Sequence, residues 1–288
     1  MNVKMIVYVM VLGFAIAAGG CSRKQSAANS LQIKGSDTMV NLGQAWAEAF
    51  MKIEPKISVA VTGGGSGTGI ASLLAKTCDI AECSRELKAE EIALGKQKGF
   101  EPRQIIVALD GLAVIVHPAN PVSRLTLGQL AQIFTGSIRD WKDVDGTPGP
   151  IVVLSREVNS GTHVYFKEHV LRRGKVDGKE EFAPDALLLP SSQAIADEVA
   201  QNPAAIGYYG MGYVTSKQKA VAVALDAAAP YVEPTIANVL AKTYPISRPL
   251  LFVTHGQPQG PVDRFIDFVL SPEGQKIVSR LDFVPVKP

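Results

Sequence analysis

A short stretch near the middle of the chain combines residue types that together can bind an oxyanion. An apolar strand at 151–154 leads through Arg156 to Ser160, Gly161 and Thr162, where a helix begins. Arginine offers a planar fork of N–H donors, the hydroxyls can donate at the helix start, and glycine lets the backbone approach a ligand. Free amides and the helix dipole also favour negative charge there. The stretch predicts an anion site; the alternative is an ordinary cap beside a surface arginine.

Three earlier junctions between a strand and a helix repeat this pattern. The predicted strands at 31–34, 57–62 and 79–83 each run into a polar turn before a helix. These turns contain Ser36, Asp37, Thr38, Ser66 and Ser84. The first turn offers three candidate caps although one helix needs only one. Repeated junctions of one kind favour the anion site over an isolated helix cap.

The glycine run at 63–69 invites comparison with a nucleotide-binding P-loop. A Walker A motif requires Lys and then Ser or Thr after the last glycine, and this chain has Ile70 and Ala71 there. We therefore exclude a nucleoside triphosphatase. Bare amides and Ser66 can still surround oxygen atoms at the start of a helix predicted at 70–75. A flexible linker fits poorly, because the run lies tightly between a strand and that helix.

Composition indicates a globular, exported protein with no nucleic-acid partner. The 288 residues are 47% hydrophobic, which suits one large domain or two smaller ones. The net charge of +2 falls to +1 without residues 1–20, which contain Lys4 as their one charged residue, and no basic cluster is evident. The histidines are dispersed, so we expect no metal site and no cofactor; they are His117, His163, His169 and His255.

The N-terminus has the pattern of an export signal. Lys4 precedes the apolar stretch 5–18, which is too short to span a membrane and ends in small residues, so residues 1–20 are predicted to be a signal peptide. Cys21 follows Ala-Gly-Gly and resembles the cysteine of a bacterial lipobox, which becomes lipidated. Residues 21–30 then form a flexible tether. A plain secretory signal with an incidental cysteine is the alternative.

Two further cysteines, Cys78 and Cys83, are predicted to remain reduced. An extended segment between them places their α-carbons about 16 Å apart at about 3.3 Å per residue. A disulfide needs roughly 7 Å or less. We expect two buried thiols.

Strands and helices alternate along the chain, which implies an open α/β architecture. An apolar pair of strands at 105–109 and 112–117 is interrupted by Asp110 and Gly111, and the chain is expected to cross between domains near 113 and again at 244–245. The remaining elements are helices predicted at 89–96, 126–136, 191–199, 262–270 and 273–281, and strands at 204–209, 221–225 and 250–254.

The order of motifs resembles the phosphate-binding lipoprotein of bacterial ABC transporters. The matching motifs are Gly-Ser-Asp-Thr at 35–38, the glycine run at 63–69, Cys-Ser-Arg-Glu-Leu at 83–87, Ile-Phe-Thr-Gly at 133–136 with Trp141, Arg156 with Ser-Gly-Thr at 160–162, Ala-Ile-Gly-Tyr at 205–208, and Gly-Gln at 274–275. They cover essentially the whole mature chain. The stretches at 133–141 and 156–162 are individually specific, whereas the glycine run and the Gly-Gln pair are not.

The resemblance implies a type II periplasmic-binding-protein fold with two lobes, open sheets flanked by helices and a ligand cleft between the lobes. Lobe one comprises 31–113 and 247–288, and lobe two comprises 114–246. Implied phosphate contacts fall on Ser36, Asp37, Thr38, Ser66, Ser84, Arg156, Ser160, Gly161 and Thr162. The implied function is capture of inorganic phosphate for a membrane-embedded ABC permease, without catalysis, by a monomer that a lipid anchors on the periplasmic face of a membrane.

This chain departs from the family pattern at two turns. Many members have Ser-Asp where this chain has Ser84 and Arg85, and that aspartate accepts the proton that phosphate carries and sulfate lacks. Asp37 stands where the family often has Thr or Ser. We expect Asp37 to take over as proton acceptor. The alternative is that Asp37 caps the helix that begins near Met39.

Three other functions compete with phosphate capture. A receptor for sulfate, molybdate or tungstate is disfavoured, since a nearby carboxylate repels an anion that has no proton to share. A hydrolase would pair Ser160 with His163, but the sequence shows neither an acidic partner nor a Gly-x-Ser-x-Gly turn. An adhesin or phosphate sensor on the same scaffold stays open.

Overall fold

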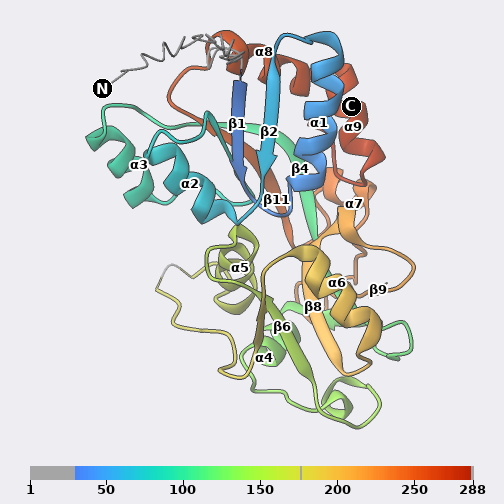
Figure 1. The fold of residues 1–288 in the computed structure, drawn as a ribbon. Coiled ribbons are helices and arrows are strands. Elements are labelled where there is room, and N and C mark those ends of the chain that lie inside the picture. The colour runs from blue at the N-terminus through green and yellow to red at the C-terminus, as the bar shows by residue number, and fades with distance from the viewer. Residues whose placement is uncertain (1–29, 176, 287–288) are drawn as a thin grey trace, which may run out of the picture.

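The chain folds into two α/β lobes that are joined by two strands, β4 (Arg103–Val116) and β11 (Ser247–Thr254) (Figure 1). The computed structural model describes residues 30–175 and 177–286. The predicted two-lobed α/β fold is confirmed. The predicted signal peptide, Cys21 and nearly all of the predicted tether lie outside the described residues.

The first lobe is built on β1 (Ser30–Gly35), which lies between two parallel partners, β2 (Ser58–Thr62) and β3 (Ile80–Cys83). Strand β11 continues this sheet as the antiparallel neighbour of β3. One face packs against α1 (Val40–Ile53), α8 (Gly260–Leu270) and α9 (Pro272–Arg280) through a core that includes Trp46 and Phe265. The other face packs against α2 (Ser66–Leu74), with α3 (Ala89–Gln97) outside it.

The second lobe continues the same sheet through β8 (Ala205–Gly210), β6 (Val152–Arg156) and the edge strand β7 (Leu187–Leu189). Its helices are α4 (Leu127–Phe134), α5 (Gly161–Phe166), α6 (Ser192–Gln201) and α7 (Ile236–Leu240). A stack of aromatic rings fills its larger core: the Phe166 and Tyr208 ring centroids lie 3.8 Å apart, and Phe134 meets both edge-on. Short parallel strands β5 (Arg124–Thr126) and β10 (Ala222–Ala224) form a separate pair, and β9 (Lys219–Ala220) pairs with β4.

Strand β4 is continuous, so the predicted break at Asp110 and Gly111 is wrong. Its first part pairs with β11 and its second part pairs with β8, which makes β4 the strand that both lobes share. Both residues have turn-forming preferences, but tertiary contacts override them. Asp110 is completely buried and forms an ion pair with Arg248 of β11.

Three other boundaries differ from the predictions. Helix α2 begins at Ser66, inside the glycine run, and not at Ile70, because the glycines of the run enter the helix itself. The strand predicted to end at 154 continues to Arg156, since β7 adds a partner along its second half. The segment 221–225 contributes only β10, which pairs parallel with β5.

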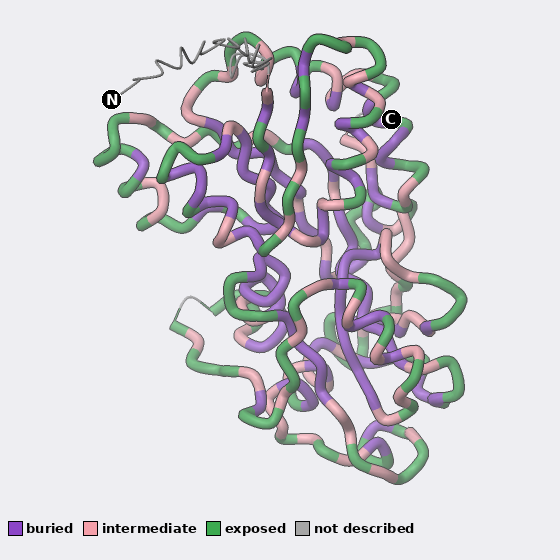
Figure 2. The backbone as a smooth tube through the Cα atoms, viewed as in Figure 1, coloured by how far each residue is buried: buried purple, intermediate pink, exposed green. Residues whose placement is uncertain are grey.

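The burial pattern follows these layers. Figure 2 shows buried backbone along the strands and where α5 meets the first lobe. Cys78 and Cys83 are free and buried, as predicted, and burial raises the pKa of Cys78 to about 12. In the described ranges, no helix has both the length and the apolar character needed to cross a membrane.

Candidate functional site

The structure brings the nine predicted binding residues together where the two lobes meet. They come from the turn before α1, the start of α2, the residue after β3, the end of β6 and the start of α5. Eight are buried: Ser36, Thr38, Ser66, Ser84, Arg156, Ser160, Gly161 and Thr162. The ninth, Asp37, has a side chain that is 16% exposed. The site is thus a nearly sealed polar surface between the lobes.

Hydroxyl groups meet directly across this surface. Thr38 Oγ1 and Thr162 Oγ1 lie 2.9 Å apart and share a hydrogen bond between the lobes. Within the first lobe, the Ser84 amide donates to Ser66 Oγ at 3.1 Å. A methyl group added at Gly161 would lie 2.3 Å from Ser66 Oγ and 2.7 Å from Ser84 Oγ, so only glycine permits this approach.

The start of α5 is capped by its own serine. Ser160 Oγ accepts a hydrogen bond from the Thr162 amide at 3.2 Å. Helix α5 continues without interruption into a π-helical turn, Lys167–Leu171. The cap orients the first turn of α5 toward the hydroxyls of the first lobe.

Arg156 is held by groups from both lobes. Its Nη2 donates to Asp37 Oδ2 at 2.6 Å and to the Pro190 carbonyl at 2.8 Å. Its Nε donates to the Leu189 carbonyl and its Nη1 to Ser192 Oγ, each at 3.3 Å. A guanidinium has five N–H donors, so these four bonds leave one Nη1 donor for another acceptor. The arginine is therefore fixed in position by the end of β7 and the start of α6.

Asp37 bonds to four partners, one of which is the Val40 amide at 3.4 Å from the Asp37 carbonyl, but its side chain does not cap α1. Its Oδ1 accepts from the Gly64 amide at 3.0 Å, its Oδ2 accepts from Arg156, and its carbonyl accepts from the Tyr213 hydroxyl at 2.7 Å. The N-cap of α1 is Met39, which makes no side-chain capping bond. The capping interpretation of Asp37 is therefore wrong.

Asn159 was missed by the sequence analysis although it joins the lobes. Its side-chain amide donates to the Gly64 carbonyl at 2.9 Å, and its own carbonyl accepts from the Gly67 amide at 2.9 Å. A methyl group at Gly65 would lie 2.8 Å from the Asn159 carbonyl oxygen. Part of the glycine run therefore serves close contact with the second lobe. The position of Asn159 between Arg156 and Ser160 was the available signal.

A buried ion pair beneath the site was also missed. Arg248 Nε and Nη2 both donate to Asp110 Oδ2, at 3.0 and 2.9 Å, and neither side chain is exposed. Arg248 Nη1 donates to the Ser84 carbonyl at 3.0 Å, and Nη2 lies 3.3 Å from Thr38 Oγ1. Asp110 Oδ1 accepts from the Met211 amide at 3.1 Å. The one sequence signal was a charged residue at the start of an apolar strand.

The Ser160–His163 pair that a hydrolase would use does not form. His163 Nδ1 lies 2.8 Å from the Arg156 carbonyl and 3.3 Å from Ser155 Oγ. Ser160 Oγ instead caps α5. Burial lowers the pKa of His163 to about 4, so the ring is neutral and supports the backbone of Arg156.

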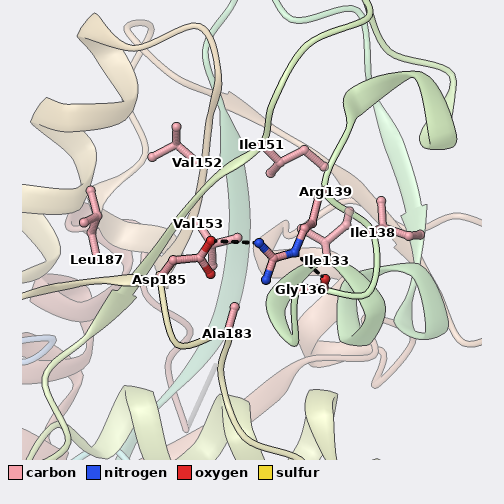
Figure 3. Close-up of a pocket in the computed structure, with 10 residues that line it drawn as sticks. All are labelled: Ile133, Gly136, Ile138, Arg139, Ile151, Val152, Val153, Ala183, Asp185 and Leu187. Carbon is pink, nitrogen blue, oxygen red and sulfur yellow. Dashed lines mark hydrogen bonds and ion pairs between the residues drawn. The ribbon is translucent and has the colours of Figure 1, made fainter.

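The stretch at 133–141 has a structural role in the second lobe. It borders a cavity of about 190 Å³ that none of the nine site residues lines (Figure 3). Gly136 ends α4 with a φ of +79°, a backbone conformation that favours glycine. Arg139 donates to the Gly136 carbonyl at 2.9 Å and pairs with Asp185, another residue lining the cavity, at 3.1 Å. That pair is exposed, and the cavity is otherwise lined mostly by aliphatic side chains.

Comparisons with known proteins agree with this geometry. The PBP superfamily domain matches residues 22–273. Phosphate-binding protein PstS of Pseudomonas aeruginosa is 33% identical over 274 residues, which cover 89% of this chain and 83% of that protein. PstS of Bacillus subtilis is 28% identical over 301 residues, covering 98% of this chain and 94% of that protein.

Solved structures give the same result. A phosphate ABC transporter substrate-binding protein with bound phosphate, from Clostridium perfringens, superposes with a TM-score of 0.80 at 38% identity and covers 90% of this chain and 100% of that one. An ABC-type phosphate transport receptor from Vibrio cholerae superposes with a TM-score of 0.71 at 30% identity. The match covers 89% of this chain and 99% of that one.

Fold and site together define a two-lobed solute-binding protein of the PBP superfamily. Within that class, the chain belongs to the family of the phosphate-binding protein PstS. This is a family of transport receptors and not of enzymes.

The Arg248–Asp110 pair leads to a prediction about stability. Asp110→Asn leaves a buried guanidinium without its counter-charge, and we expect it to lower the free energy of unfolding by about 3–5 kcal/mol. Replacing both partners with apolar residues, Arg248→Met with Asp110→Leu, should lower it less. Urea denaturation followed by circular dichroism measures each value.

The exposed Arg139–Asp185 pair provides the control. Arg139→Ala should change the free energy of unfolding by about 1 kcal/mol or less, because exposed ion pairs contribute little. An Asp110→Asn effect no larger than that of Arg139→Ala would contradict the role given to the buried pair.

Proposed function

We propose that this protein captures inorganic phosphate between its two lobes and delivers it to a membrane-embedded ABC permease. The observation that carries the proposal is the convergence of hydroxyls, helix starts and Arg156 from both lobes at one buried surface. The 38% identical relative from Clostridium perfringens was solved with phosphate bound, which supports the choice of ligand. We assign the nine residues of the site as its phosphate contacts.

The charges around the site suit a buried anion. Two arginines, Arg156 and Arg248, are each paired with a carboxylate, Asp37 and Asp110, so these four side chains have no net charge. Phosphate would therefore be held mainly by O–H and N–H donors and by the positive ends of helices. Hydrogen bonds from such donors compensate the desolvation of the anion.

The lobes are proposed to close on the ligand as two units, 31–113 with 247–288 and 114–246. Contacts between the lobes support this division: Thr38 with Thr162, Asp37 with Arg156, and Asn159 with the glycine run. All of these contacts lie among or next to the nine residues proposed to contact phosphate. Closure by a monomer would bring phosphate and donors together and exclude water in one step.

We assign selectivity against sulfate to Asp37. Phosphate near neutral pH carries at least one proton, and an ionised carboxylate can accept it, whereas sulfate offers no proton. Each of the two Asp37 carboxylate oxygens accepts one hydrogen bond from the described residues, and a carboxylate oxygen can accept a second. Asp37 can therefore accept a phosphate proton while it remains paired with Arg156.

We place the protein on the periplasmic face of a bacterial membrane, as a lipoprotein attached through Cys21 after removal of a signal peptide. The basis is the residue pattern Lys4, apolar 5–18 and Ala-Gly-Gly-Cys. A phosphate sensor or adhesin would use the same binding site, but the relatives named for phosphate transport favour delivery to a permease.

Arg156→Ala tests the ligand and the site together. We expect the wild-type protein to bind inorganic phosphate and the variant to lose at least about 2 kcal/mol of binding free energy, roughly a thirtyfold increase in Kd. The reason is loss of a buried charge-assisted donor. Titration calorimetry measures both proteins, with Arg139→Ala as the control that keeps its affinity. A loss under about tenfold would exclude Arg156 as a contact.

Asp37→Asn tests the origin of selectivity. We expect weaker phosphate binding and a smaller ratio of phosphate to sulfate affinity, because the amide can donate to either anion. If Asp37 acted only by orienting Arg156, both affinities would change by the same factor. Calorimetric titration of the variant with each anion distinguishes these results, and unchanged rejection of sulfate would refute the assignment.

Cys21→Ala tests anchoring. The variant should bind phosphate with wild-type affinity but appear in the soluble fraction, because a lipid and not the folded lobes holds the protein at the membrane. Membrane fractionation and intact mass of the wild-type protein measure this. Wild-type protein without lipid mass, or a variant that still sediments with membranes, would contradict the lipoprotein assignment.

A further inference from the structure

A carboxyl group is sealed behind the proposed phosphate site. Glu82 is the third residue of β3, two residues before Ser84, and it is 0% exposed. Neither carboxyl oxygen has a hydrogen-bond partner among the described residues. Buried polar atoms are nearly always hydrogen-bonded, so this exception requires an explanation.

The position of Glu82 places it under the start of α1. Side chains alternate along a strand, and Ile80 belongs to the core beneath α1, so Glu82 faces the same helix. A methyl group added at Gly43 would lie 2.3 Å from Glu82 Oε1. Gly43 is the fourth residue of α1. The carboxyl therefore fits against the first turn of the helix that Ser36, Asp37 and Thr38 precede.

The surroundings of Glu82 disfavour its charged form. The titratable groups that face it are the Asp37 carboxylate, the Tyr213 phenol and the neighbouring Cys83 thiol. The other elements around it bring Gly43 from α1, Val61 from β2, Gly35 from β1 and Phe252 from β11. Burial and then the Asp37 carboxylate raise the pKa of Glu82 well above its ordinary value.

We propose that Glu82 is a positioning residue of the phosphate site, whose ionisation and phosphate binding exclude each other. The inference rests on the proposed function. An ionised Glu82 would lie at the positive end of the α1 dipole and repel an anion bound at the turn before that helix. Bound phosphate, in turn, favours the neutral acid. Phosphate capture thereby retains one proton on Glu82, or takes one up from solvent when the free protein has lost it.

The direction of the pH effect follows from this linkage. As pH rises above the pKa of Glu82 in the free protein, that protein loses the proton, and binding must restore it. The Kd for phosphate then increases by up to tenfold per pH unit. The unfolded chain loses the same proton near pH 4.3, so wild-type stability falls relative to a neutral variant as pH rises from there to the folded-state pKa.

Glu82→Gln is the test, because it keeps the shape of the side chain and removes its titration. The Kd for inorganic phosphate is measured by calorimetry from roughly pH 5.5 to 9 for the wild type, Glu82→Gln and Glu86→Gln. Glu86 is an exposed carboxylate four residues further along the chain and serves as the matched control. Phosphate's own ionisation affects all three proteins alike and cancels in the ratio of their Kd values.

We expect the ratio of wild-type to Glu82→Gln Kd to be constant at low pH and to rise by up to tenfold per pH unit once the pH exceeds the pKa of Glu82 in the free protein. The ratio of wild-type to Glu86→Gln should stay constant. Urea denaturation should show that the free energy of unfolding of Glu82→Gln increases relative to that of the wild type as pH rises. If Glu82→Gln does not fold, Glu82→Met, an uncharged side chain of similar length, takes its place with the same expected ratio.

The outcomes separate this inference from the proposed function. If the wild type binds phosphate but the ratio of its Kd to that of Glu82→Gln is the same at every pH measured, the inference is overturned and the proposed function stands. A wild type that binds no phosphate at any of these pH values would refute the proposed function itself.

Discussion

The buried ion pair between Arg248 and Asp110 is the interaction on which the rest of the site depends. It joins β11 to β4, the two strands that connect the lobes, and neither partner is exposed. Its remaining hydrogen bonds reach Ser84 and Thr38 in the first lobe and Met211 in the second. Both lobes are therefore positioned against this ion pair, which lies where β4 and β11 pair. A buried pair of this kind is useful only when nearly all its donors and acceptors are satisfied, and here they are.

Charge balance would allow the proposed site between the two lobes to hold an anion without a strongly positive surface. Arg156 is paired with Asp37 and Arg248 with Asp110, while burial raises the pKa of Glu82 and so favours its neutral form. The attraction for an anion then arises from fixed dipoles, the hydroxyls, amides and helix starts, which are oriented before the ligand arrives. Fixed donors distinguish anions by geometry and protonation, whereas net charge distinguishes them only by valence.

Close approach between the lobes depends on residues without side chains. Gly161 packs against Ser66 and Ser84, and Gly65 and Gly67 pack against the backbone of Asn159. A methyl group at Gly161 or Gly65 would lie within 3 Å of an atom of the opposite lobe. The glycines therefore allow backbone and hydroxyl groups from two lobes to share one small volume, which a ligand the size of a tetrahedral oxyanion requires.

The order of strands and helices, and most of the polar turns between them, could be predicted from local residue patterns. Hydrophobic periodicity and capping residues are local signals, so the turns at Ser36–Thr38, Ser66, Ser84 and Ser160–Thr162 could be found without a structure. Local patterns also misled: Asp110 and Gly111 predicted a break in β4, and Asp37 seemed a possible cap.

Which of those groups meet, and how their charges are balanced, depends on contacts between distant parts of the chain. Arg248 and Asp110 are 138 residues apart in sequence, and Arg156 and Asp37 are 119 apart. No local pattern records such a separation. The same holds for Glu82, because burial under α1 and then the Asp37 carboxylate raise its pKa, and neither is a local feature of the sequence. Protonation and pairing depend on the packed environment, which exists only once both lobes have folded.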